Sequence, residues 1–262
     1  MAEYGYPVLF ALFAWWFATG VVLVLARLSR RSLPWSLGLA TAVLAAALWA
    51  LHSMSGTATI AAAYCSFTSA LLVWGWVELT YFTGVVTGPR AAPCPAGVSG
   101  WQRFVFGVQA SLWHELAIIG FAAAIVAVTW GGANQVGTWT FVVLWVMRWS
   151  AKLNLFLGVP NLNEEFFPEH LRYLRTYIAK RSVNPLFPVS VTVATIVAVL
   201  LVQGALAAEG FEAVGLALVT ALLALAILEH WFLVLPLPDA ALWSWLLRLR
   251  GPRVGGAARP AP

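Results

Sequence analysis

The sequence predicts an all-α, polytopic membrane protein with about seven transmembrane helices. Hydrophobic residues make up 61% of the 262 residues, charged residues only 10%, and the mean hydropathy is +0.84. Soluble globular domains carry roughly 25% charged residues, so a chain with so few cannot cover itself with a hydrated surface. The 15 tryptophans agree with this class, because the indole ring favours the interface between bilayer and water.

Seven apolar segments are long enough to cross the hydrocarbon core, which takes about 20 residues in a helix. They are residues 7–26, 34–52, 57–82, 104–129, 137–157, 186–207 and 211–235. Polar or glycine-containing stretches separate them, and no internal repeat is evident. We therefore expect a single transmembrane helical domain over residues 1–250 and a disordered cytoplasmic tail over residues 251–262, whose sequence is of low complexity.

The 15 Lys and Arg residues predict the orientation of these helices. Outside the spans they occur only in the first, third and fifth connections and after the last span. The connections at the other end contain Glu209 and Glu212 but no Lys or Arg. Because cytoplasmic loops are enriched in Lys and Arg, we expect the N-terminus outside and the C-terminus in the cytoplasm. The net charge of +5 is thereby explained by topology, and nucleic acid is not an expected partner.

Two amphipathic segments predict short interfacial helices on the cytoplasmic face of the membrane. In residues 168–180, Leu171, Leu174 and Ile178 recur on one face, behind a proline at the first helical position. Residues 239–250 repeat this pattern with leucines and tryptophans, and arginines lie near the end. Such segments bury their apolar face at the boundary between head groups and acyl chains.

Polar side chains also lie inside four of the predicted spans, where an ionisable group costs about 2.5–3.5 kcal/mol unless it is paired, hydrated or used. They are Glu78, His114, Glu115, Arg148, Lys152, Asn154, Glu229 and His230. Arg148 and Lys152 are four residues apart and share a helix face. Because arginine keeps its proton, we expect Arg148 to pair with a carboxylate in the membrane, with Glu115 or Glu78 as the first candidates.

Three interpretations of this polar set remain open: a buried charge network that fixes helix packing, a ligand-binding cavity open to the cytoplasm, and a metal site. The candidate metal ligands are Glu78, His114, Glu115, Glu229 and His230, since His and carboxylate ligands suit iron, zinc or manganese. Neighbouring helical residues point about 100° apart, so each Glu–His pair directs only one side chain well at an ion. The candidate axial ligands for a magnesium tetrapyrrole are His114, His170 and His230.

The stretch "RWSAKLNLFLGVPNLNEEFFPEHLRYL", residues 148–174, predicts one wall of a polar vestibule that faces the cytoplasm. Arg148, Lys152 and Asn154 extend along about 9 Å of helix before a glycine and a proline end it. The expected mouth residues are Asn161, Asn163, Glu164, Glu165 and His170. The alternative is a tightly hydrogen-bonded loop that ends the helix and holds no ligand.

The same stretch, extended to "RWSAKLNLFLGVPNLNEEFFPEHLRYLRTYI" and followed by "NPLFPVSV", resembles the photosynthetic complex assembly protein 2 family, of the PuhE type. The stretches "WGWVELTYFTGVVTGPR", "LWHELAI" and "LEHWFLVLPLPDAALW" are similar to the family's other motifs. The resemblance covers most of residues 65–245.

This resemblance implies a multi-pass protein of the bacterial inner (intracytoplasmic) membrane in anoxygenic phototrophs. Genes of the family accompany those for the reaction-centre H subunit and for bacteriochlorophyll synthesis. The implied function is that of an assembly factor for the photosynthetic reaction centre and core light-harvesting complex, with an influence on the supply of bacteriochlorophyll. The implied partners are reaction-centre or core antenna polypeptides and the lipid bilayer, with bacteriochlorophyll as a candidate ligand. No catalytic residue is carried over.

Two other classes of function stay open. A membrane enzyme that acts on a pigment or isoprenoid would use the Glu/His set with a metal, but no ligand spacing supports it, and the residues favour a non-enzymatic role. A transporter of a small anion or a porphyrin would be expected to show a repeat or paired spans broken by Gly or Pro, and neither is evident.

Overall fold

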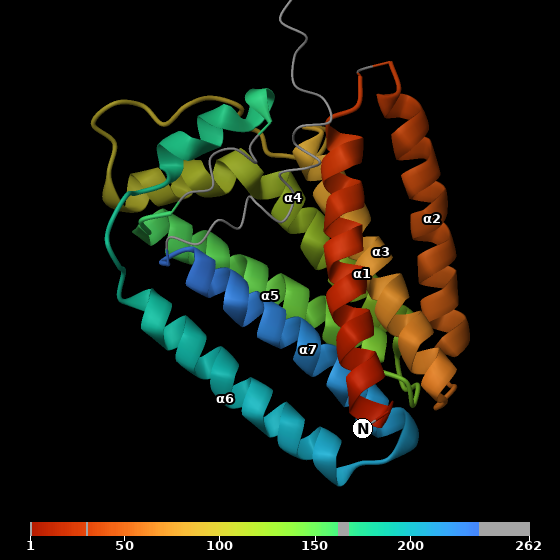
Figure 1. The fold of residues 1–262 in the computed structure, drawn as a ribbon. Helices are drawn as coiled ribbons and strands as arrows, with labels where there is room; N and C mark the ends of the chain where they lie inside the picture. Colours follow the sequence, from red (N-terminus) through yellow and green to blue (C-terminus); the bar gives the residue numbers. More distant parts are fainter. Residues whose placement is uncertain (1, 30, 162–167, 236–262) are drawn as a thin grey trace, which may run out of the picture.

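The computed structural model describes residues 2–29, 31–161 and 168–235, and over these ranges it contains helices and no strand (Figure 1). The elements are α1 (Ala2–Ala26), α2 (Leu33–Met54), α3 (Ile60–Phe82), α4 (Gly100–Thr129), α5 (Val136–Leu157), η2 (Glu169–Tyr177), α6 (Leu186–Ala207) and α7 (Gly210–Phe232). The seven α-helices are each long and apolar enough to cross a membrane. The predicted all-α fold with seven spans is confirmed.

The predicted boundaries lie within five residues of the observed ones. The largest differences are at the starts of α1 and α4, which begin at Ala2 and Gly100. Hydropathy marks the lipid-soluble part of a helix, whereas its hydrogen-bonded turns continue into the interface. The predicted surface helix at 239–250 and the predicted tail at 251–262 lie outside the described residues.

The connections between helices gather at two ends of the bundle (Figure 1). The α1–α2, α3–α4 and α5–α6 connections lie at one end, and the α2–α3, α4–α5 and α6–α7 connections lie at the other. Apart from the two basic residues in α5, the described Lys and Arg residues lie in or beside the α1–α2, α3–α4 and α5–α6 connections: Arg27, Arg31, Arg90, Arg103, Arg172, Arg175, Lys180 and Arg181. We call this the basic end. That it faces the cytoplasm stays a prediction from charge.

α3 and α7 form the centre of the bundle. In each of these two helices, 50% of the residues in an apolar 18-residue stretch are buried inside the protein, against 17–22% in the other five helices. Phe67 of α3 and Leu218 of α7 lie in one apolar cluster, to which α1 and α5 also contribute. Val73 of α3 lies in a second cluster with Leu51 of α2 and Ile118 of α4. The outer faces of the remaining helices are left for contact with lipid.

Exposed tryptophans mark both ends of the bundle. Trp35 and Trp101 are exposed near the basic end, where α2 and α4 begin. Trp49, Trp130 and Trp139 are exposed near the opposite end. Two belts of this kind are typical of helices that span a bilayer, since indole rings favour both interfaces.

The predicted interfacial helix at 168–180 differs from the observed element in type and in contacts. Residues Glu169–Tyr177 form a 3₁₀-helix, in which side chains three apart lie on one face. The buried side chains of that face are Leu171, Leu174 and Tyr177. They pack against Tyr81 of α3 and Ala110 of α4. The apolar stripe therefore faces protein and not the bilayer, and the predicted third position, at 178, falls beyond the helix.

α4 changes direction along its length (Figure 1). Its 30 residues span about 45 Å, more than the hydrocarbon core of about 30 Å, so part of the helix extends beyond that core unless it tilts or bends. The α3–α4 connection docks on its backbone: the His114 N–H donates to Thr87 O at 3.0 Å, and the Arg90 N–H donates to Gln109 O at 3.4 Å. Gly88 permits this approach, because a Cβ there would lie 2.1 Å from Gln109 O. A bend where an outside group meets the helix backbone is a known geometry.

Candidate functional site

The charged side chains of the spans meet where α3, α4 and α5 pack. Arg148 Nη2 donates a hydrogen bond to Glu78 Oε2 on α3 at 3.0 Å, which confirms the predicted ion pair of this arginine. One turn later on α5, Lys152 Nζ donates to Glu115 Oε1 on α4. The two cations thereby connect α5 to both of its neighbours. We call Glu78, His114, Glu115, Arg148 and Lys152 the charge cluster.

The Glu115–Lys152 half of the cluster is well paired. Trp149 Nε1 donates to the second carboxylate oxygen of Glu115, so both oxygens are engaged. The Lys152 ammonium also lies 5.2 Å from the centroid of the Tyr81 ring, within the range of a cation–π contact. An ion pair satisfied on both sides is a structural link more readily than a binding site.

The Glu78–His114 half is less complete. Glu78 Oε1 is buried without a hydrogen-bond partner among the described residues. His114 Nε2 lies 4.0 Å from this oxygen, which is too far for a hydrogen bond. His114 is 0% exposed, its ring centroid lies 4.2 Å from that of Tyr81, and neither of its ring nitrogens is hydrogen-bonded in the described part of the chain. Buried polar atoms without partners are uncommon, so this half of the cluster is the stronger candidate for a functional site.

A cavity of about 340 Å³ lies beside this half, between α1, α3, α5 and α7. Its charged lining residues are Glu78, Arg148 and Glu229, and most of the others are apolar. The Arg148 side chain is 31% exposed, against 11% for Glu78, so the guanidinium reaches the cavity. Glu229 is close enough to Arg148 to interact with it electrostatically. Among the described lining residues, two carboxylates and one guanidinium sum to a formal charge of −1, and we call this the charged cavity.

In the described part of the chain, His230 and Asn154 form no hydrogen bond with these ion pairs, and both bind Ser150 instead. His230 Nδ1 donates to Ala226 O at 2.8 Å, so in the neutral ring Nε2 accepts from Ser150 Oγ at 2.9 Å. Asn154 Nδ2 donates to Ser150 O at 2.9 Å and to Ser190 Oγ at 3.1 Å. These contacts connect α5, α6 and α7 in the interior of the bundle.

The predicted vestibule mouth is only partly described. Asn161 donates from Nδ2 to Phe232 O at 3.2 Å and to Leu235 O, so it closes the end of α7. His170 is exposed on η2, and its ring lies against Gly84 beyond the end of α3. The other mouth residues lie outside the described residues: Asn163, Glu164 and Glu165. The contacts of Asn161 are at the end of α7, and both the vestibule and its alternative, a loop that ends α5 without a ligand, stay predictions.

Asn184 has a structural role that the sequence analysis missed. It is 1% exposed, and its Nδ2 donates to Asn154 O at 3.2 Å and Gly158 O at 2.9 Å, at the end of α5. Its Oδ1 accepts from the Leu186 and Phe187 N–H groups at 3.0 and 3.1 Å, at the start of α6. One side chain thus satisfies two helix termini, which otherwise leave backbone groups unpaired. The Asn-Pro pair before an apolar run was an available signal.

Comparison with known proteins identifies the family. The family model described as "Protein of unknown function (DUF3623)" matches residues 1–253. The chain belongs to the DUF3623 family.

This membership covers every described helix and the whole charge cluster. The chain is also 39% identical over 258 residues to a Rhodobacter capsulatus protein described as "Uncharacterized 30.4 kDa protein in puhA 5'region". That similarity covers 96% of this chain and 93% of the other protein. No solved structure matches the chain.

Of the candidate metal ligands of this DUF3623 chain, Glu78 and His114 face each other, whereas Glu115 and His230 are directed to other partners. Within the described ranges, no three His, Cys, Asp or Glu side chains are close enough to hold a metal ion. Glu115 binds Lys152, and His230 binds Ser150. His114 is enclosed and His230 uses both ring nitrogens, so neither presents a nitrogen to a bound macrocycle. The three interpretations of the polar set stay predictions, and the contacts of the described residues show ion pairing between the spans.

Proposed function

We propose that this multi-pass membrane protein assists assembly of the photosynthetic reaction centre and its core light-harvesting complex in the bacterial inner (intracytoplasmic) membrane. The observation that carries the proposal is the 39% identity to a protein whose description places it in the puhA 5′ region, which suggests a photosynthesis-related role. The resemblance to the PuhE type, carried by the stretch that begins at Arg148, points to the same context.

The charged cavity is the part of the molecule that we assign to client binding. Its formal charge of −1 attracts a cationic or hydrogen-bond-donating group, and the low dielectric of the membrane interior strengthens that attraction. A basic side chain on a transmembrane helix of a reaction-centre or core antenna polypeptide has this chemistry. Glu78 and Glu229 would receive it, while Arg148 keeps the two carboxylates from repelling each other.

Co-purification from phototrophically grown cells tests this function. We expect the tagged protein to retain reaction-centre or core antenna polypeptides, identified by peptide mass spectrometry, and an absorbance spectrum of the same sample shows whether bacteriochlorophyll accompanies them. Glu229→Gln should reduce this retention without lowering the amount of protein, because it removes one negative charge from the cavity. Glu209→Gln, which changes an exposed glutamate, is the matched control.

Either of two results would contradict the proposed assembly function. The first is a deletion strain with normal amounts of reaction centre and core antenna. The second is a set of variants in which core-complex assembly follows only the abundance of the protein.

A further inference from the structure

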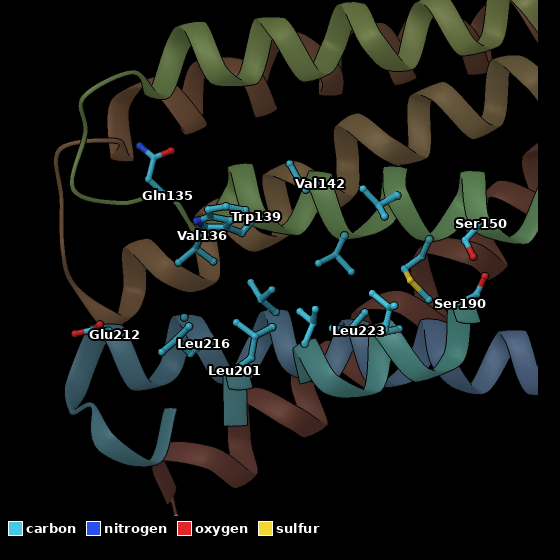
Figure 2. A pocket seen from close by; sticks show the side chains of 18 of the residues that line it. Gln135, Val136, Trp139, Val142, Ser150, Ser190, Leu201, Glu212, Leu216 and Leu223 are labelled. Carbon is cyan, nitrogen blue, oxygen red and sulfur yellow. The ribbon is translucent and has the colours of Figure 1, made fainter. Parts of the chain in front are cut away.

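A second cavity lies between α5, α6 and α7 and is larger than the charged cavity (Figure 2). Its volume is about 630 Å³, within the range of about 300–1,000 Å³ that is usual for small-molecule sites. It exists because α6 packs closely on α7 and only lightly on α5. Its long walls are apolar and include Val143, Val193, Leu201 and Leu223. We call it the apolar cavity.

The polar lining residues are confined to the two ends of this cavity. Figure 2 shows Ser150 and Ser190 together at one end, with Gln135 and Glu212 at the other. Along α5, Ser150 lies about 21 Å from Val136 and about 10 Å before the end of the helix at Leu157. The two serines therefore lie well inside the thickness of the membrane.

The serine end offers one acceptor and one donor. The Ser150 hydroxyl donates to His230 Nε2, so the lone pairs of its oxygen face outward as acceptors. Ser190 Oγ accepts from Asn154 Nδ2, and within the described ranges its own O–H has no acceptor. The hydrogen bond from Ser150 to His230 and the one from Asn154 to Ser190 fix both hydroxyls in position. Such an end matches an uncharged oxygen-bearing group such as an alcohol or a carbonyl.

The charges around the cavity exclude a phospholipid head. Among the described residues, no Lys or Arg lines the cavity, and the one charged lining residue, Glu212, is at the opposite end and repels phosphate. A phospholipid head also has to stay in the interface, whereas the serine end lies about 10 Å from the end of α5. Membrane molecules with an uncharged head that enters the hydrocarbon layer include isoprenoids, such as prenols and prenylated quinones, whose single alcohol or carbonyl oxygens match the two serines.

We propose that the apolar cavity binds a neutral isoprenoid. The hydrocarbon chain lies along the walls of α5, α6 and α7, and the oxygen of the head exchanges hydrogen bonds with Ser150 and Ser190. The two cavities share Met147 in their linings, but this proposal does not rest on the charged cavity or on the assembly role proposed above.

Photo-crosslinking of the purified full-length protein in lipid nanodiscs tests this site. The probes are a diazirine derivative of geranylgeraniol, which is a neutral isoprenoid, and a diazirine derivative of phosphatidylglycerol. We expect the first probe to label peptides of α5 and α6 that line the cavity, and unlabelled geranylgeraniol to compete. Labelling of the same peptides to the same extent by the phosphatidylglycerol probe would show ordinary lipid contact and overturn the proposal.

Two matched substitutions on α6 locate the label. Val193→Trp fills the cavity and should lower isoprenoid labelling about tenfold, because an overfilled site loses binding free energy. Ile196→Trp lies outside the cavity on the same helix, at an exposure of 55% against 56% for Val193, and should leave labelling unchanged. Ser190→Ala, which removes one hydrogen bond, should weaken competition by geranylgeraniol about fivefold. Equal labelling of the Val193→Trp and Ile196→Trp proteins would contradict the site.

Discussion

At Arg148, a guanidinium that keeps its charge is held inside the membrane by the carboxylate of Glu78, with Glu229 nearby. Each partner depends on the other, because a buried charge that loses its counter-ion keeps its desolvation cost. The exposed part of Arg148 faces the charged cavity, so this residue both stabilises the bundle and shapes the proposed client site.

Arg148→Leu should destabilise the protein by about 3 kcal/mol, the low end of the range for a broken buried pair, since the Arg148 side chain is 31% exposed. Adding Glu78→Leu should recover part of that loss, because it removes the unpaired carboxylate. The measurement is thermal unfolding of the detergent-solubilised protein, with Arg31→Leu in an exposed connection as the control. Strictly additive losses for the two substitutions would mean that the residues do not stabilise one another.

Asn184 gives a sharper test at the same scale. Asn184→Asp keeps the acceptor for the α6 N–H groups but loses the donor to Asn154 O and Gly158 O. We expect Asp and Ala at this position to lower the free energy of unfolding similarly, by about 2 kcal/mol, because both leave buried carbonyls at the end of α5 unpaired. The measurement is the free energy of unfolding of the Asn184→Asp and Asn184→Ala proteins in the same detergent, compared with that of the parent protein. An Asp variant as stable as the parent protein would assign the stabilisation to the cap of α6 alone.

The sequence predicted which side chains carry charge in the membrane but could not choose their partners. Both Glu78 and Glu115 were candidates for Arg148, and each carboxylate in fact binds a different cation of α5. The choice depends on how α3 and α4 are rotated about their axes. Helices that are apolar on nearly every face contain little periodic information about that rotation.

At the scale of elements, the seven spans were predictable because the bilayer imposes their length and composition. The 3₁₀-helix η2 was not predictable in the same way. Its apolar stripe was assigned with the α-helical period of 3.6 residues and therefore included Ile178. The buried residues follow a period of three, so Tyr177 takes the third position. The close contact between the α3–α4 connection and α4 was also missed, since it depends on Gly88 and leaves no hydropathy signal.

Gly88→Ala tests that contact. The added Cβ would overlap Gln109 O at 2.1 Å, so the connection has to move away from α4, at a cost of about 1–3 kcal/mol. We expect a lower unfolding temperature and faster cleavage of the connection in limited proteolysis. Gly56→Ala is the control, because a Cβ there meets nothing within 4 Å. Equal behaviour of the two alanine variants would show that the connection does not rest on α4.

For the whole molecule, the collection of basic residues at one end predicts how the chain lies in the membrane. Phosphatase fusions after Arg31 and after Lys180 should be inactive, as expected for the cytoplasm, and a fusion after Glu209 should be active. The reason is that cytoplasmic loops retain Lys and Arg during insertion. If the fusions after Arg31 and Glu209 reported the same compartment, the proposed orientation would be wrong.

The two ion pairs of α5 also have a consequence for how the protein is made. α5 has the lowest mean hydropathy of the seven spans, 1.2, and its two cations each cost about 2.5–3.5 kcal/mol in a bare bilayer. Their carboxylates are on α3 and α4, which the ribosome delivers first. When α5 leaves the translocon, Glu78 and Glu115 are therefore already in the membrane and can pair with its two cations. We expect a chain that lacks either glutamate to insert α5 more slowly.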